Sequence, residues 1–134
     1  MILITSDEKR EVNVGQYEIW HCLYSTVAVR LKDFEEKAPL AFRFLQSGEC
    51  ASAEATKTAR DINLVRDELS KIPPESAVFD LNDMERETPW KDHLSEVITS
   101  CNTMFTTSDG KDLLYEIVSI LCYAGVKGVD VTHQ

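Results

Sequence analysis

The spacing of hydrophobic residues changes abruptly between Thr88 and Leu121, so this stretch gives the clearest structural prediction. Residues 94–101 carry apolar side chains on one face of a helix, and Pro89 can only precede or begin such a helix. The run 103–107 is short and rich in β-branched and aromatic residues, which favours a strand. After a turn, apolar residues return at helical spacing, with Asp109 placed to cap this second helix. The pattern predicts a helix, a strand, a turn and a helix.

Two strands and a helix are predicted near the start of the chain. Met1–Thr5 is an apolar run, and residues 12–19 alternate between apolar and polar side chains as a half-buried strand does. Gly15 interrupts the alternation, so we expect a hairpin or a bulged strand. From Trp20 to Phe34 the apolar residues recur at helical spacing, and Pro39 limits this helix.

The remaining segments predict two more helices and two more strands. A short helical face at 40–45 is followed by Gly48, which suits a left-handed helix end. A longer face begins at Ser52, in an N-cap position, and continues to a pair of prolines. Residues 76–81 and 129–132 are short, partly alternating and bounded by turn-forming residues, as strands are.

The predicted fold class is therefore α+β. Neither a repeat nor a linker divides the sequence, so we expect residues 1–134 to form a single compact domain. The domain should contain a small, mostly antiparallel sheet of about three to five strands with about four helices packed on it.

The charge balance narrows the choice of partners. The chain has 23 acidic and 14 basic residues, and its formal net charge is −9. A negative field repels phosphate backbones and attracts basic proteins, so nucleic acid is disfavoured as a partner. The competing interpretation is that the acidity only maintains solubility. The sequence shows neither an apolar run of about 18 residues nor a secretory leader, so we expect a cytoplasmic protein without a membrane partner.

The four cysteines are isolated from one another, which predicts reduced and mostly buried thiols in the cytosol. No histidine and cysteine share a spacing typical of a metal site, and Gly110-Lys111 lacks the rest of a phosphate loop. We therefore expect no metal or cofactor. One alternative remains open, a thiol-dependent enzyme that combines Cys22 or Cys101 with His21 or His93.

The segment from Asp80 to Asp92 has no hydrophobic period and is rich in carboxylates. Acidic pairs can perform acid–base chemistry or hold a hard cation, but a solvated loop is the simpler interpretation. Trp90 in this loop is either a plug that seals the core or an anchor for a partner.

At these residues the sequence resembles the immunity protein 70 family. The resemblance is carried by Pro89-Trp90, by Ile98-Thr99, by the joint from Phe105 to Leu113, and by Asp130-Val131-Thr132. Similar patterns occur earlier, at 23–26, 44–48, 67–72 and 79–80. Lys91 and Met104 depart from the family, which tends to have a glycine and a bulky aromatic residue at these positions.

The resemblance implies a cytosolic immunity protein of a bacterial contact-dependent inhibition system. Such a protein is not an enzyme, and it binds and neutralises the toxic C-terminal domain of an effector, here expected to be a basic nuclease. An acidic inhibitor can place carboxylates where phosphates would lie. An acidic adaptor for an unrelated basic protein is the remaining alternative. The candidate toxin-binding residues lie in the loop from Asp80 to Asp92 and at the end of the first helix: Asp80, Asp83, Glu85, Glu87, Trp90, Asp92, Glu35 and Glu36.

Overall fold

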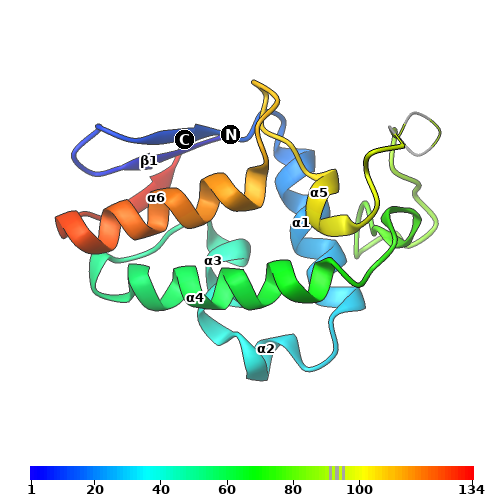
Figure 1. The fold of residues 1–134 in the computed structure, drawn as a ribbon, viewed down its shortest axis with the longest axis horizontal. Coiled ribbons are helices and arrows are strands. Elements are labelled where there is room, and N and C mark those ends of the chain that lie inside the picture. The colour runs from blue at the N-terminus through cyan, green and yellow to red at the C-terminus, as the bar shows by residue number, and fades with distance from the viewer. Residues whose placement is uncertain (91, 93, 95) are drawn as a thin grey trace.

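The computed structural model describes residues 1–90, 92, 94 and 96–134. Its sheet has three antiparallel strands, with β1 (Ile2–Thr5) between β2 (Glu11–Asn13) and β3 (Val131–His133). Leu3 pairs with Val12 on one side of β1, and Thr5 pairs with Val131 on the other. The predicted first strand, hairpin and closing strand are thus confirmed, and both chain ends lie at this sheet (Figure 1).

Six α-helices and one 3-10 turn are present among the described residues, against a prediction of about four helices. They are α1 (Tyr17–Arg30), α2 (Phe34–Lys37), α3 (Pro39–Ser47), α4 (Ser52–Leu69), η1 (Pro74–Ser76), α5 (Cys101–Met104) and α6 (Leu113–Lys127). Both α2 and α5 are single turns. The sheet and helices together make an α+β fold, as predicted.

The core is centred on α4 and α6, which lie side by side and antiparallel, with α6 between α4 and the sheet (Figure 1). Gly125 allows this close packing, because a Cβ at that position would collide with Thr56 of α4. The largest fully buried side chains come from β1 and from most of the helices: Leu3, Leu23, Phe44, Leu45, Ile62, Leu69, Phe105, Leu113, Leu114, Ile117, Ile120 and Leu121.

Several element boundaries differ from the prediction. Tyr17 begins α1 and does not extend β2, because Gly15 adopts a left-handed φ of 92° and turns the chain. The cap of α6 is Asp112, whose Oδ1 accepts the Tyr115 N–H at 3.1 Å, whereas Asp109 bonds Thr107. The residue at the N-cap of α4 is Ala51, and Ser52 is the first helical residue.

Three predicted elements were wrong. Residues 76–81 do not form a strand, because the segment bonds to side chains of α1 and not to the sheet. Residues 94–101 do not form the expected helix at the positions described, which exclude 95, and Val97 is 80% exposed. Residues 103–107 contain the end of α5 and an isolated bridge from Thr106 to Asp112, but no strand.

Candidate functional site

The segment that follows η1 is fixed to α1 by buried hydroxyl groups. The Thr26 hydroxyl accepts a hydrogen bond from the Val78 N–H at 2.9 Å and donates one to the Val78 carbonyl at 3.2 Å. The Ser25 hydroxyl accepts the Leu81 N–H at 3.1 Å. Both hydroxyl residues are fully buried. The backbone groups of this segment, which make no sheet hydrogen bonds, therefore find their hydrogen-bond partners on α1. These bonds set the base of the acidic loop, which we define as residues 80–92.

Asp80 is bonded to two groups at the start of the acidic loop. Its Oδ1 accepts the Asn82 N–H at 2.9 Å and lies 3.1 Å from His21 Nε2 of α1. The Asn82 N–H and then His21 hold the pKa of Asp80 below the usual value of 3.8. Asp80 therefore helps to fix the start of the acidic loop on α1.

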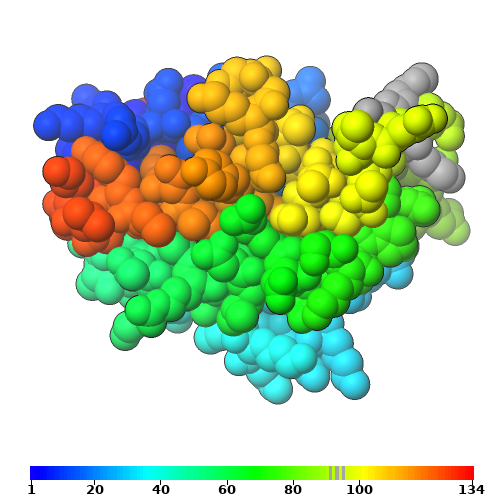
Figure 2. Space-filling model, viewed as in Figure 1, coloured from blue at the N-terminus to red at the C-terminus, as the bar shows by residue number. Residues whose placement is uncertain are grey.

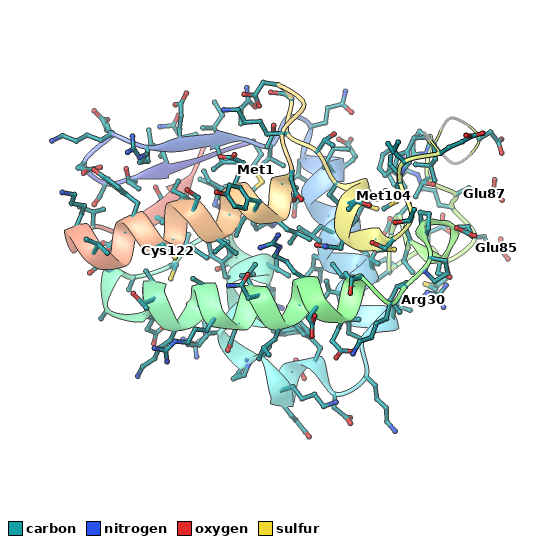
Figure 3. All side chains as sticks on the ribbon, in the orientation of Figure 1. Met1, Arg30, Glu85, Glu87, Met104 and Cys122 are labelled. Carbon is teal, nitrogen blue, oxygen red and sulfur yellow. The ribbon has the colours of Figure 1, made fainter. Side chains whose placement is uncertain are left out.

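The acidic residues beyond Asp80 face solvent. Asp83, Glu85, Glu87 and Asp92 are all exposed, and Glu85 and Glu87 lie on the outer side of the loop (Figure 3). Two backbone hydrogen bonds, from Asp83 N–H to the Asp80 carbonyl and from Arg86 N–H to the Asp83 carbonyl, fold the loop into successive turns.

A pair of aromatic rings supports the acidic loop from beneath. The Phe79 ring is buried and meets the Trp90 ring edge-on, with centroids 6.0 Å apart. The Arg86 guanidinium lies 4.5 Å from the centroid of Phe79, so this positive group folds back onto the protein. The Trp90 indole N–H is buried without a hydrogen-bond partner, beside a pocket of about 270 Å³ that Ile19, Leu94 and Phe105 help to line. The half-buried Trp90 ring thus packs towards the core.

Glu35 and Glu36 lie on α2, on a different part of the surface from the acidic loop (Figure 2). Both side chains are exposed and line a groove of about 400 Å³ between α1, α2 and α3. The structure therefore does not bring all the predicted residues together in one patch.

A row of aromatic rings on α1 was missed by the sequence analysis. The rings of Tyr17, His21 and Tyr24 follow one another along the helix at centroid distances of 6.2 and 6.5 Å. Phe42 of α3 continues the row at 5.7 Å from Tyr24. Their spacing in α1, at i, i+4 and i+7, was the available signal, but the alternating pattern at 12–19 hid the first residue.

The thiols give no support to the alternative of a thiol-dependent enzyme. Burial raises the pKa of Cys22 to about 12 and that of Cys101 to about 11, so both are protonated at neutral pH. The His21 ring bonds Asp80, and His93 lies outside the described residues. The prediction that the thiols are mostly buried holds for three of them, while Cys122 is exposed.

Other chemistries find little support in the part of the chain that the structure describes. There, no three His, Cys, Asp or Glu residues gather as a metal site would require. None of the helices described combines the length and the apolar character needed to cross a membrane.

Comparison with known proteins identifies a family for this chain. A family model described as immunity protein 70 matches residues 5–132, nearly the whole chain. No curated protein and no solved structure matches. The matched region includes both the acidic loop and α2.

Proposed function

We propose a function from one premise, which is that the chain belongs to the immunity protein 70 family. Membership makes it an immunity protein and implies a toxin as its protein partner. The function we propose is to bind and neutralise the toxic C-terminal domain of a bacterial contact-dependent inhibition effector, in the cytoplasm and without catalysis. We further propose that the toxin is a basic nuclease and that residues 1–134 act as one immunity domain.

The charge distribution supports a basic partner. The acidic loop contains five carboxylates against two basic residues, Arg86 and Lys91, in a chain whose net charge is −9. The Arg86 guanidinium is held against Phe79, and the Glu85 carboxylate faces solvent. Exposed carboxylates on a fixed loop attract a basic cleft over a distance and accelerate association.

The candidate residues then divide by role. The exposed Asp83, Glu85, Glu87 and Asp92 contact basic side chains of the toxin. Asp80 and Trp90 support the loop from inside the protein, because Asp80 bonds to α1 and Trp90 packs on Phe79. Glu35 and Glu36 form a second contact region on α2.

Family membership is the observation that carries this proposal, and coexpression tests it. The probe is the C-terminal domain of the protein encoded directly upstream of this gene, because an immunity gene follows its toxin gene. Expression of that domain alone should arrest growth, and coexpression with this protein should restore it. The two proteins should also copurify at micromolar concentration in low salt.

The matched control is the same coexpression with an immunity protein of another family that is equally acidic. Rescue by both proteins would indicate a nonspecific effect of charge. Failure of this protein to rescue growth, together with failure to associate in low salt, would contradict the proposal.

A further inference from the structure

The groove between α1, α2 and α3 has an aromatic floor and an acidic rim. Tyr24 of α1, Phe34 of α2 and Phe42 of α3 supply the floor. The Phe42 ring lies 5.7 Å from each of the other two rings, at angles of 52° and 60°. Tyr24 and Phe42 are only half-buried, so their rings are accessible from the groove.

Charges are segregated around α2. Asp33, Glu35 and Glu36 line this groove, whereas Lys32 and Lys37 line a separate groove between α2 and α4. Within the described residues, none of the three carboxylates forms an ion pair. The aromatic groove is thus bordered by negative charge that the protein itself leaves uncompensated.

We propose that this groove, which we call the cation groove, receives an arginine side chain of the toxin, an inference that rests on the proposed function. A guanidinium stacks on aromatic faces and bonds carboxylates through paired N–H donors, so the floor and the rim suit different parts of the same group. A hard metal cation is a poorer match, because the rings provide no oxygen ligands.

The electrostatics of Tyr24 agree with this assignment. Burial, and after it the negative charge of Glu35, raises the pKa of the Tyr24 hydroxyl. The electric field of the Glu35 carboxylate therefore reaches the part of the groove that the Tyr24 ring borders. A cation bound there is stabilised by both groups, and it offsets the repulsion between the carboxylates.

A small-molecule titration tests the cation groove without the toxin. The probe is N-acetyl-L-arginine amide, and its control is the neutral analogue N-acetyl-L-citrulline amide, which is nearly the same size. In NMR spectra of the full chain, the arginine probe should shift the ring signals of Tyr24 and Phe42 saturably, and the control should not. Tyr115, an exposed ring on α6, serves as the internal reference. Equal shifts with both probes, or equal shifts at Tyr115, would overturn the proposal.

Affinity for the toxin domain tests whether the groove is used. The substitution Tyr24→Leu, or Glu35→Gln together with Glu36→Gln, should raise the dissociation constant of the toxin complex by about tenfold or more. Tyr24→Phe keeps the ring and should change it by less than about twofold. Glu8→Gln with Glu11→Gln removes the same charge from the β-hairpin, where it should have little effect.

The outcomes separate the two proposals. If the wild-type protein binds the toxin and the groove variants bind equally well, the cation groove is wrong and the proposed function stands. If the wild-type protein does not bind the toxin, both proposals fail. Circular dichroism of each variant excludes unfolding as the cause of a lost affinity.

Discussion

The packed pair α4 and α6 and the segment 77–100 are held in place by different forces. Five large apolar side chains of α6, including Leu113 and Leu114, are fully buried, and α4 presents a buried stripe to the same core. The segment 77–100 has little regular structure at its described positions. Side-chain hydrogen bonds from α1 hold its start, where the Val78 and Phe79 side chains are buried. Apolar burial therefore dominates in one region, while polar contacts with α1 add to a smaller apolar anchor in the other.

A cavity in the packed pair should have the largest effect. Leu114→Ala removes a fully buried side chain and should lower the free energy of unfolding by about 2–5 kcal/mol. Leu64→Ala is the matched control, because that leucine lies on α4 and is 52% exposed, and it should cost less than about 1 kcal/mol. Urea denaturation measures both. Equal losses would mean that α4 and α6 do not form the stabilising core.

Loss of the tether on α1 should have a smaller effect on stability and a local effect on structure. Thr26→Val leaves the Val78 N–H and carbonyl without their buried partner and should cost about 1–3 kcal/mol. Amide exchange at 77–81 should accelerate, while exchange in α6 changes only with the global stability. Thr26→Ser keeps the hydroxyl and should retain slow exchange. If exchange at 77–81 is unaffected by Thr26→Val, the hydroxyl does not hold the acidic loop.

The same contrast explains what the sequence could predict. Helices α3, α4 and α6 follow from apolar periodicity, because their burial repeats with the helical period, and Pro39 and Gly48 mark the two ends of α3. The segment at 76–81 alternates like a strand, but its hydrogen-bond partners are Ser25 and Thr26, far away in the sequence. Propensity does not reveal a partner of that kind.

The short helix α5 shows a second way in which local pattern fails. Residues 103–107 favour a strand by composition, but the Ser100 hydroxyl accepts the Asn102 N–H at 3.2 Å and begins a helical turn. The Cys101 N–H is also fixed, by the Ile72 carbonyl at 2.9 Å. The acidic loop itself was identified from composition alone, whereas the cation groove depends on Tyr24, Phe34 and Phe42 meeting from three helices, which no linear pattern shows.

Acid should weaken the attachment of the acidic loop slightly. The pKa of Asp80 is lowered below 3.8 in the folded protein, so its stabilising effect is complete above that value. The effect is lost as the pH falls through the lowered pKa. Stability measured by urea denaturation should therefore decline more steeply below about pH 4 in the wild type than in Asp80→Asn. Parallel curves would show that the contacts to Asn82 and His21 contribute nothing.

The most direct test of the account is the rate constant for association with the toxin domain, measured by stopped flow over a range of salt concentrations. Asp83→Lys, Glu85→Lys and Glu87→Lys together should slow association by about tenfold or more at low salt and flatten its salt dependence, since the acidic loop steers the encounter. Reversal of two charges on the β-hairpin, Glu8→Lys with Glu11→Lys, should have a much weaker effect per charge. If the loop variant associates at the wild-type rate with an unchanged salt dependence, the acidic loop is not the surface that meets the toxin.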